Sequence, residues 1–138
     1  MSERPTGRER AQTAFKIWNE QGLEAMAERF WDPQIVWEEP PKFPDAGVRR
    51  GREECVRRMS ERLALLGDIR LELVDATDVA EHLILIEAIV RGRGTTSGAP
   101  GEMREFFLME TDGEGRTTRF REFLDRDAAR AAVHAYRP

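Results

Sequence analysis

Two adjacent carboxylates, Glu38 and Glu39, follow a short apolar run that contains Trp37. If residues 35–39 form a strand, Trp37 and Glu39 share one face, because successive side chains alternate. A carboxylate against an apolar wall has its charged form disfavoured, so its pKa rises toward the range that suits proton transfer. One hypothesis is therefore that Glu39 is a general base in a pocket. The other is that both glutamates lie at a wet strand end, where glutamate is usually exposed.

Two further glutamates fall inside predicted strands. Glu105, in "MREFFLME", would share a face with Met103 and Phe107. Glu87 is the only charge in "LILIEAIV", and a buried carboxylate needs a partner or a proton. We expect Glu87 either to form a structural ion pair, within the sheet or at a dimer interface, or to belong to a pocket. The arginines available as partners on neighbouring strands are Arg91, Arg119 and Arg121.

Most of the aromatic residues recur at helix or strand spacing, which is typical of a core. If the core is hollow, some of these side chains must line the hollow. The residues expected to line a pocket are Trp18, Trp31, Trp37, Met103, Phe107 and Arg121.

Apolar residues at helical spacing predict helices that begin near residues 7, 23, 51 and 126. Apolar runs of strand type predict strands at residues 34–39, 68–76, 82–93, 103–111 and 117–125. The first of these strands runs into a proline pair, so it is predicted to be an edge strand or to end there. Helices come first and strands joined by short turns come later, an order typical of α+β folds. We expect a strongly curved, mixed but largely antiparallel sheet that wraps around the N-terminal helices as a cone-shaped α+β barrel, with an apolar hollow inside.

The composition narrows the class of protein. The 138 residues suit one domain, expected at residues 7–138 after a flexible tail at residues 1–6. A net charge of −4 gives no basic surplus for nucleic-acid binding. A single cysteine cannot form a disulfide within the chain, and with only two histidines the chain has few side chains that could ligate a metal. We also expect no cofactor. No signal peptide and no apolar run of membrane-spanning length is visible, so we expect a cytoplasmic protein without a membrane partner.

Five segments of the chain also resemble a known family. The segments "NEQGLEAMAERF", "IVWEEP", "PDAGVRRG", "GRGTTSG" and "DGEGRTTRFREFLDRDAA", in this order, resemble the SnoaL-like branch of the nuclear-transport-factor-2-like superfamily. The resemblance implies a cone-shaped α+β barrel with an apolar pocket, and frequently a homodimer formed through the outer face of the sheet. The superfamily includes cofactor-independent cyclases, ketosteroid isomerases, epoxide hydrolases, dehydratases and binding domains without activity, so the fold alone does not fix the function.

The resemblance also suggests roles for individual residues. "VWEEP" is similar to the Val-Glu-Asp-Pro segment of the isomerases, and alignment at the proline puts Glu39 at the position of their general base. Glu105 falls near the position of their protonated aspartate, which donates a hydrogen bond to the developing oxyanion. Their first-helix tyrosine is matched by about Ala14 here, which departs from the pattern. An alternative site, similar to that of the epoxide hydrolases, would combine Glu87, Arg121 and Glu39.

The expected ligand is a small apolar molecule. The first functional hypothesis is a cofactor-independent acid/base enzyme, which would be an isomerase, cyclase, dehydratase or hydrolase. The alternative is a ligand-binding or dimerisation module without activity. The acid beside Trp37 favours the enzyme, whereas the missing helix tyrosine and the scarcity of histidine favour the alternative.

Overall fold

The computed structural model describes residues 5–138, so most of the tail expected at residues 1–6 lies outside the described residues. Four helices are present in this range: α1 (Gly7–Gln21), α2 (Leu23–Phe30), α3 (Arg52–Leu63) and α4 (Arg126–Ala135). The strands in the same range are β1 (Trp31–Glu38), β2 (Val48–Arg50), β3 (Leu66–Ala80), β4 (Leu83–Gly94), β5 (Pro100–Thr111) and β6 (Thr117–Phe123). Every helix and strand predicted from the sequence is found, and the short strand β2 was not expected.

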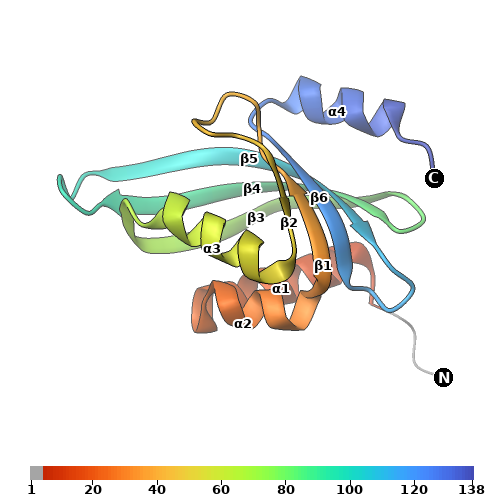
Figure 1. Ribbon diagram of the computed structural model, residues 1–138, viewed down its shortest axis with the longest axis horizontal. Helices are drawn as coiled ribbons and strands as arrows, with labels where there is room; N and C mark the ends of the chain where they lie inside the picture. The colour runs from red at the N-terminus through yellow and green to blue at the C-terminus, as the bar shows by residue number, and fades with distance from the viewer. Residues whose placement is uncertain (1–4) are drawn as a thin grey trace.

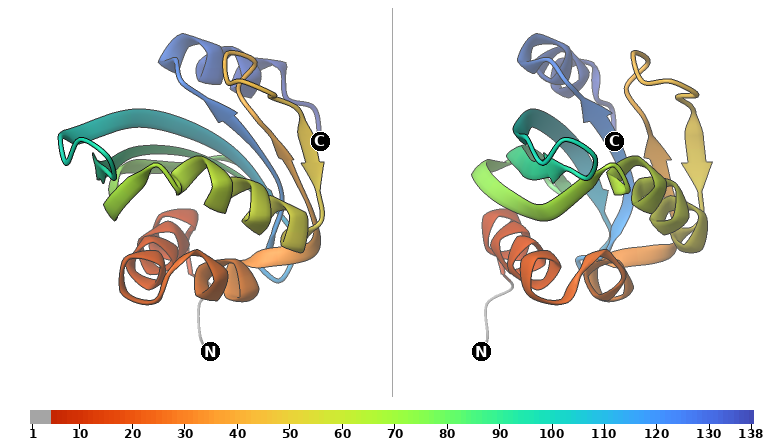
Figure 2. Two further views of the ribbon diagram at one scale, coloured as in Figure 1. Left: turned by 60° about the vertical axis from the view of Figure 1, so that its left-hand side comes forward. Right: turned by 90° about the vertical axis from the view of Figure 1, so that its left-hand side faces the viewer.

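All of these strands belong to one sheet, in the order β2-β1-β6-β5-β4-β3. Neighbouring strands are antiparallel except β1 and β6, which are parallel. The sheet bends strongly, with α1, α2 and α3 on its concave side and α4 against its convex side (Figures 1 and 2). The predicted α+β fold, with a curved and largely antiparallel mixed sheet, is confirmed. The sheet does not close into a complete barrel, because β2 and β3 remain its two ends.

Strand β1 differs from its prediction in two respects. It lies between β2 and β6, so the proline pair at residues 40–41 ends the strand and does not mark an edge of the sheet. It also begins earlier than predicted, at Trp31, and includes Pro33. Proline is tolerated there because the pairing of β1 with β6 is irregular between Trp31 and Val36.

Local sequence signals set the ends of the first two helices. α1 begins at a capping box, in which the Thr6 hydroxyl accepts a hydrogen bond from the Glu9 amide and the Glu9 carboxylate accepts one from the Thr6 amide. Gly22 separates α1 from α2 with a φ of 100°, a conformation that glycine adopts without strain. The tight connection allows α1 and α2 to pack against each other below the concave face of the sheet (Figure 2).

Strand β4 alternates its side chains between the two faces of the sheet. Ile84, Ile86 and Ala88 are buried on the concave side. Leu83 points to the convex side, where it packs in one cluster with Ala132 of α4. β4 is therefore a central strand covered on both sides, as its continuous apolar run predicted.

No helix within residues 5–138 combines the length and the apolarity needed to cross a membrane. The homodimer and the cytoplasmic location expected from the sequence stay predictions. Light scattering would test the homodimer, since a monomer at micromolar concentration would contradict it.

Candidate functional site

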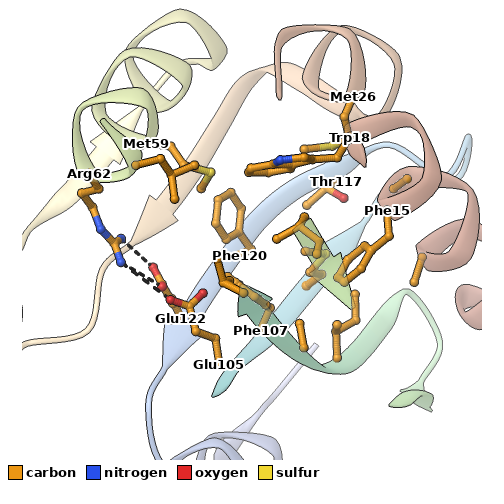
Figure 3. A pocket seen from close by; sticks show the side chains of 18 of the residues that line it. Phe15, Trp18, Met26, Met59, Arg62, Glu105, Phe107, Thr117, Phe120 and Glu122 are labelled. Carbon is orange, nitrogen blue, oxygen red and sulfur yellow. Dashed lines mark hydrogen bonds and ion pairs between the residues drawn. The ribbon is translucent and has the colours of Figure 1, made fainter. Parts of the chain in front are cut away.

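A cavity of about 660 Å³ lies between the concave face of the sheet and helices α1, α2 and α3. Most of its wall is apolar, with aromatic side chains such as Phe15, Trp18 and Phe107 facing the space (Figure 3). This volume falls within the range of small-molecule sites, roughly 300–1,000 Å³. The hollow expected between sheet and helices is therefore present.

Three charged side chains meet at one end of the cavity: Arg62 from α3, Glu105 from β5 and Glu122 from β6 (Figure 3). Both terminal nitrogens of Arg62 donate hydrogen bonds to the Glu122 carboxylate, at 2.9 and 3.1 Å. Trp37 Nε1 donates another hydrogen bond to Glu122, at 3.1 Å. Arg62 also lies 3.9 Å from Glu105. Because the side chains of Glu122 and Glu105 are only 2% and 9% exposed, this is a buried ionic cluster that opens onto an apolar space.

The two carboxyl groups of the cluster are not equivalent. Burial raises the pKa of Glu105 well above its ordinary value, and the negative charge of Glu122 and a hydrogen bond between the two groups raise it further. The charge of Arg62 acts in the opposite direction but is outweighed. Glu105 therefore favours its protonated form and can donate a hydrogen bond or a proton, while Glu122 accepts hydrogen bonds from Arg62 and Trp37.

The cluster depends on three elements that are distant in sequence. In the antiparallel pair β5–β6, Phe107 lies opposite Glu122, and Glu105 shares the face of Phe107 two residues earlier. Arg62 stands in the last turn of α3, where the helix dipole favours a basic side chain. Its guanidinium packs over the ring of Phe43, 3.9 Å from the centroid. This stacking holds Arg62 in the position from which it reaches Glu122.

Glu39 is placed differently from its prediction. Its side chain is fully buried, but it does not belong to the described residues that line the cavity. The Nε atoms of Arg49 and Arg58 both contact its Oε1, at 2.5 and 3.0 Å. Burial by itself would raise the pKa of Glu39, but the hydrogen bonds and charges of Arg58 and Arg49 outweigh this effect and lower the pKa. The rise in pKa expected from the sequence is therefore wrong, because the sequence pattern did not reveal these two partners.

Glu87 lies on the convex side of the sheet, away from the cavity. Its carboxylate contacts Arg104 of β5 and Arg126 of α4, the latter at 2.9 Å. Arg121, which was expected in the pocket, binds Glu38 at 3.0 Å instead. Neither Glu87 nor Arg121 lines the cavity, so the combination of these residues with Glu39 is not assembled. Glu87 instead forms a structural ion pair, which was the other role considered for it. Its partners are Arg104 and Arg126, so the expected partners Arg91, Arg119 and Arg121 are wrong.

Most of the other residues that were expected around a pocket line the cavity. Glu105 faces the cavity, on the strand face that its alternation indicated. Trp37 is fully buried behind the cavity wall and stacks on Phe120, with ring centroids 5.6 Å apart. Ala14 lines the cavity at the position that matches the tyrosine of the isomerases. The cavity wall also includes Trp18, Trp31, Met103 and Phe107.

Sequence reasoning did not single out Arg62 and Glu122. Glu122 lies between Arg121 and Phe123 in a strand of alternating type, and it was not distinguished from solvated charges on that strand. A signal was available, because Phe120 and Glu122 share a strand face, so that a buried Phe120 implies an inward Glu122. Arg62 offers no comparable signal, since it is one of many arginines in a helix of mixed charge.

The chain was compared with protein-family models and with solved structures, and both comparisons agree with the fold described above. A family model described as the SnoaL-like domain matches residues 11–134. Among solved structures, an NTF2-like protein from Burkholderia thailandensis is 22% identical, with 98% of this chain and 100% of that chain covered and a TM-score of 0.71. A hypothetical protein with ketosteroid isomerase-like fold from Catenulispora acidiphila, in complex with trimethylamine, is 15% identical over 96% of this chain and 100% of that chain, with a TM-score of 0.70.

A Mycobacterium tuberculosis protein in complex with estradiol-17β-hemisuccinate is 15% identical, with 86% of this chain and 92% of that chain covered and a TM-score of 0.68. No curated protein is significantly similar in sequence. At these identities the solved structures establish the fold and not the activity. The family model, in contrast, spans nearly all of the described chain, from the first helix to the last. The chain therefore belongs to the SnoaL-like family.

Proposed function

We propose that the protein binds a small, largely apolar molecule in the cavity and that Glu105 donates a proton to a carbonyl or hydroxyl oxygen of this molecule. The observation that supports this function is the position of Glu105: a buried carboxyl group that faces an apolar cavity beside the Arg62–Glu122 ion pair. The site then belongs to an acid/base enzyme that needs no cofactor for this step.

The surroundings of Glu105 suit a proton donor. A neutral carboxylic acid can donate to an oxygen that becomes negative during the reaction, and the apolar wall strengthens this interaction because water is excluded. The negative charge of Glu122 raises the pKa of Glu105, so Glu105 is still protonated when a ligand oxygen arrives to accept the proton. Arg62 compensates the charge of Glu122, so that the cluster as a whole tolerates burial.

Several reactions share this step. Isomerisation of an enone, cyclisation onto a carbonyl and dehydration of an alcohol all begin with, or are assisted by, proton donation to oxygen. A positioned general acid contributes about 10²–10⁴-fold to such rates. The size and apolar character of the cavity favour a ligand that is a ring system, or a chain as large as one. The complex of the Mycobacterium tuberculosis protein with estradiol-17β-hemisuccinate is consistent with such a ligand in this fold.

A specific observation favours the second candidate, a binding protein without activity. Glu39, which matches the general base of the isomerases, is paired with Arg49 and Arg58 and does not face the cavity. The matched position in the first helix is Ala14, which supplies no hydroxyl. A ligand that accepts a hydrogen bond from Glu105 would then be held without being transformed.

Proton exchange in heavy water separates the two candidates. 2-Tetralone, a bicyclic ketone, loses a hydrogen next to its carbonyl to solvent water faster when an acid protonates the carbonyl oxygen. The enol then takes up deuterium from the heavy water and returns the proton on its oxygen, and proton NMR follows the exchange. We expect the wild type to accelerate the exchange over buffer and Glu105→Gln to lose this acceleration by about 10²-fold or more. The matched control is Glu110→Gln, which changes a partly exposed glutamate of the same strand.

Each other outcome has a definite meaning. Saturable binding of 2-tetralone without acceleration would support the binding protein. Acceleration that survives in Glu105→Gln would contradict the role of Glu105 as the proton donor.

A further inference from the structure

A second group of polar side chains lines the cavity away from the acid cluster, and Thr117 is its most buried member. Thr117 is only 6% exposed, and none of the described residues forms a hydrogen bond with its hydroxyl. Thr117 lines the same cavity as Trp18 and Phe15, and Figure 3 shows its side chain with the hydroxyl oxygen in red. The hydroxyl is open to the cavity and has no partner there among the described residues, so a ligand or a water molecule inside this largely apolar space is left to bond it.

The orientation of Thr117 results from an irregularity in β6. Glu110 pairs with Arg119, and the next pair along the two strands is Thr111 with Thr117. Thr118 is therefore an extra residue in β6, which is the pattern of a β-bulge. Bulges re-aim side chains, often next to functional sites, and this one brings Thr117 to the same side as Thr111. Both threonines line the cavity as a result.

Arg10 adds a positive charge to this end of the cavity. It lines the cavity from α1, and within residues 5–138 no hydrogen bond or ion pair involves its guanidinium. The guanidinium lies against Gly115, in the turn between β5 and β6, where a Cβ would come within 2.5 Å of it. The glycine thus leaves room for the arginine, yet no carboxylate of the described chain neutralises it.

We propose that Arg10, Thr111 and Thr117 form a second binding end of the cavity, which holds a carboxylate of the ligand. The guanidinium supplies the charge and the two hydroxyls can donate hydrogen bonds, which together match the oxygens of a carboxylate. Thr117 and Glu122 lie in the same strand, which rises by about 3.3 Å per residue, so roughly 15 Å separates the two polar ends. The cavity then selects an apolar molecule with a carboxylate at one end and a carbonyl or hydroxyl oxygen at the other.

This inference deepens the proposed function, because the oxygen at the opposite end would be the one that Glu105 contacts. The carboxylate site itself does not depend on catalysis. The experiment therefore treats the two ends of the ligand separately.

Calorimetric titration with three matched probes measures how much each polar end of the cavity contributes to the binding affinity. The first probe is a linear keto acid whose carboxylate and ketone lie about 15 Å apart, as the polar ends of the cavity do. The second is its methyl ester, which removes the negative charge, and the third is the fatty acid of the same length without the ketone. We expect the wild type to bind the keto acid at least about tenfold more tightly than the ester.

Variants assign this preference to residues. Arg10→Met and Thr117→Val should each reduce the preference for the acid over the ester while the affinity for the ester stays close to that of the wild type. Arg8→Met is the matched control, since Arg8 lies on the same helix but is exposed and paired with Asp75 at 3.0 Å, and it should keep the preference. Circular dichroism of each variant verifies that the fold is retained.

The outcomes distinguish this inference from the proposed function. Equal affinities of the wild type for acid and ester, a preference that Arg10→Met leaves unchanged, or no binding of any probe would overturn the second binding end. If the preference for the acid is present but Glu105→Leu, which has no hydrogen-bond donor, binds the keto acid and the fatty acid in the same ratio as the wild type, the second binding end stands and the role of Glu105 fails.

Discussion

Arg62 and Glu122 form a bidentate ion pair at the end of an apolar cavity, with both terminal nitrogens of the arginine bonded to the two oxygens of the glutamate at 2.9 and 3.1 Å. The glutamate side chain is almost completely buried and the arginine mostly so. Such a pair stabilises the fold only while both partners are present, because either charge alone would remain buried without compensation.

Arg62→Met should therefore destabilise the protein by about 3–5 kcal/mol, since it leaves the Glu122 carboxylate buried without a positive partner among the described residues, although Trp37 and Glu105 still contact it. The double variant Arg62→Met/Glu122→Gln should be less destabilised than the single variant, because the orphan charge is removed. Urea unfolding of the single and double variants measures this coupling. Arg57→Met, which removes an exposed ion-paired arginine of the same helix, should have a smaller effect. A double variant less stable than Arg62→Met would contradict the buried pair.

The raised pKa of Glu105 predicts a pH dependence of stability. The folded state holds the proton of Glu105 at pH values where the unfolded chain has released it, so the stability falls as pH rises from the ordinary value of 4.5 toward the raised pKa. Glu105→Gln removes this dependence. The free energy of unfolding of Glu105→Gln relative to the wild type should thus increase with pH, by at most about 1.4 kcal/mol per pH unit. Denaturant titrations between acidic and neutral pH measure the free energies of unfolding of the two proteins. A difference between them that stays constant across this range would refute the raised pKa of Glu105.

Glu39 should show the opposite behaviour. Its pKa is lowered because the effects of Arg58 and Arg49 outweigh burial, so its contribution to stability is complete above the ordinary value of 4.5 and is lost as pH falls through the lowered pKa. Glu39→Gln should destabilise the protein by about 3 kcal/mol at neutral pH, and less in acid. The same variant should leave the 2-tetralone exchange rate close to that of the wild type, because Glu39 does not face the cavity. Loss of exchange in a folded Glu39→Gln protein would restore Glu39 as a candidate base.

Cys55 should be unreactive in the native protein. It is fully buried, and burial together with the charge of Glu54 raises the pKa of its thiol to about 11. Thiol reagents attack the thiolate, so labelling at neutral pH should require unfolding. Labelling with a chromogenic disulfide reagent, in buffer and in denaturant, measures the two rates. Rapid labelling in buffer would mean that the helix α3 opens readily from the sheet.

The sequence allowed the order of the elements to be predicted because each one repeats a local period. The alternation of Met103, Glu105 and Phe107 predicted a common face, and that face lines the cavity. The same rule placed Glu39 inside with Trp37, and both side chains are buried.

The partners of these residues could not be predicted in the same way. Arg58 binds Glu39 across 19 positions of the chain and Arg62 binds Glu122 across 60, so these contacts follow from tertiary packing and not from local spacing. The inward position of Thr117 was equally hidden, since it depends on a bulge that interrupts the strand alternation. Periodicity therefore identifies which faces are inside, whereas the charge state of an inward acid depends on partners from other elements.

The alternation of β4 has a consequence for how this scaffold can diversify. Ile84, Ile86 and Ala88 lie on the cavity side of β4, while Leu83 packs under α4. The inner shape and the outer packing therefore depend on different residues of one strand. A smaller side chain at position 86 would enlarge the cavity, and this residue does not belong to the cluster that packs under α4. Substitutions on this inner face would therefore change which ligand the cavity accepts, while the outer face of β4 and its packing under α4 stay the same.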